Sequence, residues 1–386
     1  MALRHNIRLM YVISCLMWGR FFVPVLALFY IASQVPLEQF AIIMSVFSLS
    51  TLLLEVPTGV MADLLGKKKT LLISRFLYII EIYVIAFYNG FWPFLIAKII
   101  SGIGVSLSSG TSEALLYDTL KRLKRTDEHK NISSTQFALT NVSMAATFIT
   151  GGWLFSIDAK LPALASLPII TLGFILTFFL KEPYKPRGSL TIMHAWEHMK
   201  EAMCCVMHHP TVRYLVLFSL PIATGISILL NLSSVYFATI GVPKAGIGLV
   251  AFVASLTTAA VARIAPRVEQ RLGDHNTLFV MQTLLVAGTL LMAALVPLTG
   301  VLFYFAVPVV SGLFNVLINH YMNAHISTSH RATIISIQHL ISNLGIVIVF
   351  PIVGAIIKAE SFQTGLLTLA IFLVAYMLIL SVVKNR

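Results

Sequence analysis

The chain has 386 residues, of which 58% are hydrophobic and only 11% are charged. Soluble domains carry about 25% charged residues and could not bury so much apolar surface, so the composition excludes a soluble globular protein. The net charge of +12 fits loop lysines and arginines beside anionic lipid, and we expect membrane lipid as a partner but no nucleic acid.

Twelve apolar segments follow one another along the chain, each long enough to cross about 30 Å of hydrocarbon as an α-helix. They are residues 9–32, 40–61, 70–89, 93–117, 134–156, 162–180, 211–237, 246–265, 276–297, 299–322, 332–357 and 363–383. The sequence therefore predicts an all-α integral membrane protein with twelve transmembrane helices in two six-helix bundles. The expected domains are an N-terminal bundle (1–181), a cytoplasmic linker (182–210) and a C-terminal bundle (211–386).

Basic residues fall mainly on one side of these spans. Of the 27 lysines and arginines, 22 are counted with the cytoplasmic side, including Arg75, Arg213 and Arg263 near the cytoplasmic ends of their spans. Only Lys160, Lys244 and Lys358 fall in the opposite loops, and Arg20 and Lys98 fall deeper inside spans. Because cytoplasmic loops are enriched in lysine and arginine, both termini are predicted to be cytoplasmic.

The linker after the sixth span is polar and contains proline, and the stretch TIMHAWEHMKEAMCCVMHH follows it. Its apolar residues recur near helical spacing, which predicts an amphipathic helix on the cytoplasmic membrane surface. His194, His198, Cys204 and His208 could ligate zinc at this spacing. The amphipathic helix explains them without a metal, so we expect no metal site and no cofactor.

The loop between the second and third spans reads LEVPTGVMADLLGKKKT. A tight turn between two helices needs residues without bulk, and Gly59 and Gly66 are expected to supply them. Lys67 and Lys68 cannot enter hydrocarbon and hold the turn in water. Asp63 stands where its carboxylate could accept hydrogen bonds from a nearby helix start.

The loop between the eighth and ninth spans, PRVEQRLGDHN, repeats this pattern faintly, with Gly273 at the position of Gly66. Two related halves joined by a linker are typical of secondary transporters, which bind their substrate between the halves.

With these features the chain resembles the major facilitator superfamily over essentially its whole length. The motif that carries the resemblance consists of Gly59, Asp63, Gly66, Lys67 and Lys68. The resemblance implies a central cavity lined by spans one, four, seven and ten. It also implies that Asp63 holds the two halves together on the cytoplasmic side, near the start of span eleven.

Ionisable side chains inside predicted spans are costly in lipid and mark functional sites. Arg20, in the middle of the first span, is expected to bind an anionic substrate group or to act on a proton site, or else to form a structural pair with Glu81 or Glu113. Lys98 lies where proton-coupled members of the family often have arginine. Glu113, the deepest acid on a cavity span, is the candidate proton carrier, unless Arg20 or serine hydroxyls satisfy it. Glu81 lies on a scaffold span and is expected to be structural.

The second half offers neutral polar side chains instead. Asn231 lies on span seven, and Asn315 and Asn319 share one face of span ten. We expect them to line the cavity, and hydrogen bonding between helices is the alternative.

We interpret the chain as a monomeric secondary active transporter of a small organic solute in a bacterial cell membrane, the inner or plasma membrane. Proton-coupled efflux of drugs or metabolites is the favoured role. Uptake of an anionic metabolite or metal chelate is the alternative, motivated by Arg20 and Lys98. A non-transporting membrane sensor or interaction protein is the alternative from a different class, and an enzyme is not expected because no catalytic cluster is found.

Overall fold

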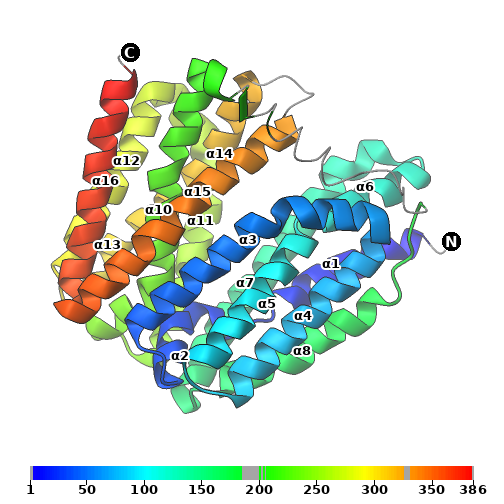
Figure 1. Ribbon diagram of the computed structural model, residues 1–386, viewed down its shortest axis with the longest axis horizontal. Helices are drawn as coiled ribbons and strands as arrows, with labels where there is room; N and C mark the ends of the chain where they lie inside the picture. The colour runs from blue at the N-terminus through cyan, green and yellow to red at the C-terminus, as the bar shows by residue number, and fades with distance from the viewer. Residues whose placement is uncertain (1–2, 185–199, 201–202, 205, 326–330, 385–386) are drawn as a thin grey trace.

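The computed structural model describes residues 3–184, 200, 203–204, 206–325 and 331–384, and within these ranges every regular element is a helix (Figure 1). The helices of the first half are α1 (Arg4–Met17), η1 (Val23–Val25), α2 (Leu26–Ala32), α3 (Leu37–Leu65), α4 (Lys67–Phe87), α5 (Phe91–Ser108), α6 (Thr111–Arg122), η2 (Thr126–Glu128), α7 (His129–Ile157) and α8 (Leu161–Thr177). Those of the second half are α10 (Pro210–Thr239), α11 (Lys244–Leu272), α12 (Asp274–Ala293), α13 (Val301–Tyr304), α14 (Ala306–His325), α15 (Arg331–Ala359) and α16 (Phe362–Lys384).

The predicted all-α membrane architecture is confirmed. Among the described residues, 9 helical stretches are long and apolar enough to cross a membrane by themselves. The remaining predicted spans also coincide with helices, but the first is divided into short pieces, α7 carries many polar side chains, and α8 has only 17 residues.

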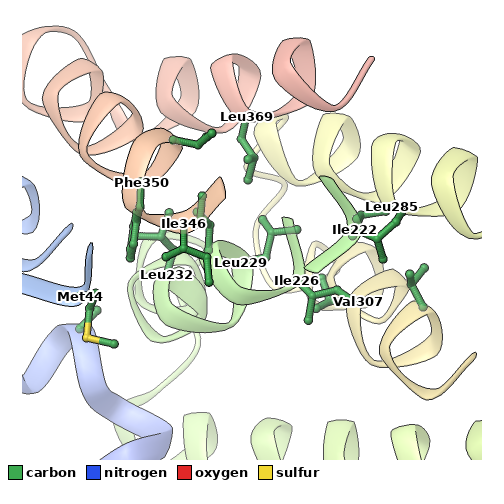
Figure 2. Packing of buried hydrophobic residues seen from close by; sticks show 14 of the residues in the cluster. Met44, Ile222, Ile226, Leu229, Leu232, Leu285, Val307, Ile346, Phe350 and Leu369 are labelled. Carbon is green, nitrogen blue, oxygen red and sulfur yellow. The ribbon is translucent and has the colours of Figure 1, made fainter. Parts of the chain in front are cut away.

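The helices form two groups, α1–α8 and α10–α16 (Figure 1). The second group is built around α10, whose apolar side chains are buried on several sides. Figure 2 shows Ile222, Ile226, Leu229 and Leu232 of α10 facing residues of α12, α14 and α15. In a membrane protein an apolar helix can face either lipid or other helices. The burial of α10 against α12, α14 and α15 therefore shows that it packs inside the C-terminal group rather than at its lipid-facing surface.

Contacts between the two groups join the first half of α3 to the last half of α15, at one end of the molecule. Ser45 Oγ donates a hydrogen bond to the carbonyl of Ile346 over 3.3 Å, and the rings of Phe40 and Phe350 meet edge to face at 5.9 Å. Near the ends of the two helices, Lys358 Nζ lies 3.2 Å from Glu38 Oε1.

The same end of the molecule holds a second contact between the groups, where α7 crosses α11. A Cβ atom on Gly152 would lie only 2.6 Å from the backbone nitrogen of Gly248. The two backbones approach this closely because neither residue has a side chain. Figure 1 shows α6 lying apart from the second group, toward the opposite end.

Two matching turns relate the halves. Gly66 (φ 92°) joins α3 to α4, and Gly273 (φ 76°) joins α11 to α12. Both residues adopt a left-handed backbone that strongly favours glycine, and both follow a helix of 29 residues. The faint sequence repeat therefore corresponds to the same helix–turn–helix in each half.

Candidate functional site

The first predicted span is divided in the middle, and the break contains Arg20. Pro24 has no N–H to donate to the carbonyl of Arg20, and its ring would clash with that carbonyl in a continuous helix. Val23 N–H donates to the carbonyl instead over 3.1 Å, and the freed N–H of Phe21 donates to Ser166 Oγ on α8 over 2.9 Å. The Arg20 side chain therefore leaves the chain at a fixed bend inside the N-terminal bundle.

Arg20 and Lys98 share one buried acid, Glu81 of α4. Lys98 Nζ lies 2.7 Å from Glu81 Oε1, and Arg20 Nη1 lies 3.6 Å from Glu81 Oε2. The exposed fractions of the side chains are 0% for Glu81, 7% for Lys98 and 18% for Arg20. The Arg20 guanidinium also stacks over the ring of Tyr78, with Cζ 4.2 Å from the ring centre. Arg20, Lys98 and Glu81 are called the ion cluster below.

The ion cluster selects among the alternatives left open for Arg20. The structure shows the pair of Arg20 with Glu81. Arg20 and Lys98, both predicted site residues, therefore contact the same acid, which was expected to be structural. Two cations and one carboxylate leave the ion cluster with an excess positive charge. Such groups are stable at membrane depth only when they are paired.

Glu113 does not take part in the ion cluster. It lies in the first turn of α6, after a break at Gly110 (φ 68°), and its side chain is 57% exposed. Ser133 Oγ donates to Glu113 Oε1 over 2.9 Å, and His129 Nε2 lies 3.0 Å from the same oxygen. The side chain is therefore not buried as expected, and no contact between Glu113 and Arg20 occurs among the described residues.

Glu113 lines a cavity of about 470 Å³ between α1, α4, α6 and α7, called the N-bundle cavity below. Its lining residues are Ser14, Met17, Trp18, Arg75, Glu113, Ser133, Gln136, Phe137 and Thr140. Six of these nine residues are polar or charged, and Met17, Trp18 and Phe137 add apolar and aromatic surface. Small-molecule sites also combine apolar surface with placed polar groups, although they are usually less polar than this cavity.

Arg75 is a site residue that sequence reasoning missed, because the lysines before it made it look like part of the loop. The structure places it in the third turn of α4, about 12 Å from the helix start, and only 7% exposed. No hydrogen bond or ion pair of its side chain is found in the described part of the chain, and its Nε is buried without a partner. Arg75 lies on the same buried face of α4 as Tyr78 and Glu81. Their helical spacing in the sequence could have indicated that Arg75 is buried.

The motif lysines tie the start of α4 to neighbouring elements. Glu182, just after α8, accepts hydrogen bonds from the backbone N–H groups of Lys67 (3.1 Å) and Lys68 (2.7 Å). Lys67 Nζ contacts Asp118 Oδ2 of α6, and Lys68 Nζ donates to the carbonyl of Phe178 over 2.7 Å. A carboxylate at a helix N-terminus satisfies free N–H groups and meets the positive end of the helix dipole.

One expectation about the motif needs correction. Only Gly66 forms the turn, because Gly59 lies inside α3 with no atom within 4 Å of a Cβ built on it. Asp63 lies in the last turn of α3, and the start of α4 is capped by Glu182. The gate contact expected for Asp63 near the start of span eleven concerns residues 328–330, which lie outside the described residues.

The predicted asparagines of the second half lie on α10 and α14. Asn231 Nδ2 donates to the carbonyl of Ser227 in its own helix over 2.8 Å. Asn315 is exposed, and its Nδ2 donates to Ser311 Oγ over 3.3 Å. The side chain of Asn319 lies outside the described part of the chain. A role for these three residues in the cavity stays a prediction.

Most of the predicted linker helix lies outside the described residues, and so do two of its possible zinc ligands, His194 and His198. Of the others, His208 Nδ1 lies 2.8 Å from the carbonyl of Cys204 in its own helical turn. Within the described residues no group of three histidine, cysteine, aspartate or glutamate side chains is arranged to hold a metal ion.

Comparisons with known proteins agree with this architecture. The family model described as Major Facilitator Superfamily matches residues 9–327. The uncharacterized MFS-type transporter YxaM of Bacillus subtilis (strain 168) is 22% identical over 374 residues, which cover 94% of this chain and 92% of that protein.

Solved structures with 14% sequence identity share the fold. The nucleoside transporter NupG has a TM-score of 0.76, with 100% of both chains covered. A bacterial homolog of the human lysosomal transporter Spinster, in an inward-facing and unoccupied conformation, has a TM-score of 0.74, with 100% of this chain and 97% of that chain covered. The D-xylose-proton symporter has a TM-score of 0.71, with 97% of both chains covered.

Proposed function

Because the chain belongs to the major facilitator superfamily and is a secondary transporter rather than an enzyme, we propose that it moves a small organic solute across the cell membrane by alternating access, coupled to protons. Efflux of drugs or metabolites is the proposed direction. The proposed topology has both termini in the cytoplasm, with the linker between the two bundles on the same side.

The observation that carries this proposal is that the bundles meet at one end of the molecule. The contacts of Glu38 with Lys358 and of Gly152 with Gly248 lie at this end. In the proposed topology that end is extracellular, and at the opposite end α6 lies apart from the second group among the described residues, which supports a conformation open toward the cytoplasm. The likeness to an inward-facing structure of the same fold supports this assignment. Breaking these contacts and forming new ones at the cytoplasmic end would complete the transport cycle.

Glu113 is the proposed proton carrier. Its carboxylate is accessible and lines the N-bundle cavity, so it could exchange protons with the side to which the cavity opens. Glu81 is fully buried, and its carboxylate already pairs with Lys98 and Arg20 in this conformation, so we assign it a structural role rather than that of the proton carrier.

The test is flux measurement in proteoliposomes with an imposed pH gradient, on solutes found by a thermal-shift screen of the purified protein. Export predicts that right-side-out vesicles lose a preloaded solute faster when the exterior is acidic. Gradient-driven accumulation inside such vesicles would show uptake instead. Absence of flux for every solute that stabilises the protein would contradict transport and favour a sensor.

A further inference from the structure

Two side chains that line the N-bundle cavity each have a buried polar atom without a hydrogen-bond partner in the described part of the chain. These atoms are Arg75 Nε and Gln136 Oε1. The Arg75 guanidinium meets the ring of Tyr78 only at a distance, with Cζ 6.0 Å from the ring centre. Gln136 Nε2 donates to Ser14 Oγ over 2.5 Å, which fixes the amide and leaves its oxygen as the free acceptor. Buried donors and acceptors are normally satisfied, and here two unsatisfied atoms belong to side chains that line one cavity, one of them on a charged residue.

The charges around Arg75 also call for an anion. Arg20 and Lys98 already share Glu81, so no acid of the ion cluster is left for Arg75. Glu113 lines the same cavity but contacts His129 and Ser133, and it forms no ion pair with Arg75 in the described structure. A buried guanidinium stays charged, because its pKa is too high for it to lose the proton, and an unmatched charge at this depth is strongly unfavourable.

The rest of the cavity wall suits an organic ligand rather than an inorganic ion. Trp18 and Phe137 are both exposed and line the cavity, which adds aromatic surface next to the polar groups. A volume of about 470 Å³ lies in the range of small-molecule pockets.

We propose that the N-bundle cavity binds a small organic carboxylate that carries a hydrogen-bond donor and an apolar body. The carboxylate accepts the paired N–H groups of Arg75, a geometry that guanidinium matches better than ammonium. A hydroxyl group of the ligand donates to Gln136 Oε1, and its apolar body lies against Trp18 and Phe137. This inference rests on the proposed function, because the bound carboxylate would be the solute that the protein transports.

The test is equilibrium binding to the purified, detergent-solubilised full chain, without any transport step. The probes are 3-hydroxybenzoate, mandelate and 3-hydroxybutanoate, each compared with its carboxamide. At least one carboxylate is expected to bind about tenfold or more tightly than its uncharged carboxamide, because a charge-assisted pair with arginine is lost in the amide. This comparison uses the unaltered protein and does not depend on any variant folding.

Variants then locate the site. Arg75→Gln is expected to weaken carboxylate binding about tenfold or more, and Arg75→Lys less, since lysine keeps the charge but not the fork. Gln136→Leu is expected to reduce the preference for 3-hydroxybenzoate over benzoate. Arg8→Gln, which removes an exposed arginine of α1 that does not line this cavity, is the matched control and is expected to bind normally.

Equal binding of carboxylates and carboxamides, no binding of any of the three carboxylates, or unchanged binding by Arg75→Gln would overturn the inference. Gradient-driven flux of an uncharged solute alongside any of these results would leave the transport proposal intact. Carboxylate binding without any flux would support the binding site but contradict the proposed transport function.

Discussion

Replacing Glu81 with glutamine removes the only negative charge of the ion cluster while keeping the size of the side chain. Lys98 at 2.7 Å and Arg20 at 3.6 Å would then be buried without a counter-ion. Removing one partner of a buried ion pair costs about 3–5 kcal/mol, because the remaining charge is left unmatched. We expect Glu81→Gln to lower the free energy of unfolding by an amount of this order.

The assay is thermal unfolding in detergent of three proteins: the unaltered chain, Glu81→Gln, and the double variant with Glu81→Gln and Lys98→Met. The single variant is expected to melt several degrees lower. The double variant is expected to recover part of the loss, because the most deeply buried unmatched cation is gone. Glu113→Gln, with its exposed side chain, serves as the control and should change stability by no more than about 0.5 kcal/mol.

A Glu81→Gln protein as stable as the unaltered chain would refute this reasoning. It would mean that the carboxyl group is already neutral in the folded protein, and that Glu81 rather than Glu113 is suited to carry a proton.

Three further predictions concern the transport cycle. Glu113→Gln is expected to abolish transport driven by a pH gradient but to leave solute-for-solute exchange largely intact, and accumulation on a proton gradient by this variant would move the coupling site elsewhere. Gly152→Val should disfavour the closed end by about 1–3 kcal/mol, because its side chain would overlap the backbone of Gly248, and spin-label distances across this end should lengthen. Asp63→Asn is expected to reduce transport more than thermal stability, and equal transport rates at equal expression would remove its role as a gate.

Much of the fold follows from the sequence because membrane spans are specified by length and apolarity alone. The helices lie where the apolar segments predict them. Gly66 and Gly273, which the sequence repeat aligns, form the same turn in the two halves. The breaks in the first and fourth spans were not predicted, although Pro24 and Gly110 were visible in the sequence. Hydropathy averages over a window and does not detect a break that a single residue produces.

The site was less predictable, because pairing depends on which helix faces turn toward each other. Arg20 and Lys98 were identified by their charge in an apolar run, but their shared partner on α4 is set by packing. Arg75 was assigned to a loop because the three lysines before it must lie in water. In the structure α4 begins at the first of these lysines, Lys67, so Arg75 lies in its third turn and is buried. The exposure of the Glu113 side chain was not predicted, because the break at Gly110 was not recognised.

The central claim, alternating access, is tested most directly by locking the end where the bundles meet. Cysteines introduced by Glu38→Cys and Lys358→Cys, in a chain whose native cysteines are replaced by serine, would be joined in proteoliposomes with a short bis-methanethiosulfonate, which forms a reducible disulfide with each cysteine and releases sulfinate. The account predicts that the cross-linked protein still binds solute from the cytoplasmic side but no longer transports it, and that reductive cleavage of the link restores flux. Full transport with the cross-link in place would contradict alternating access by separation of these two helices.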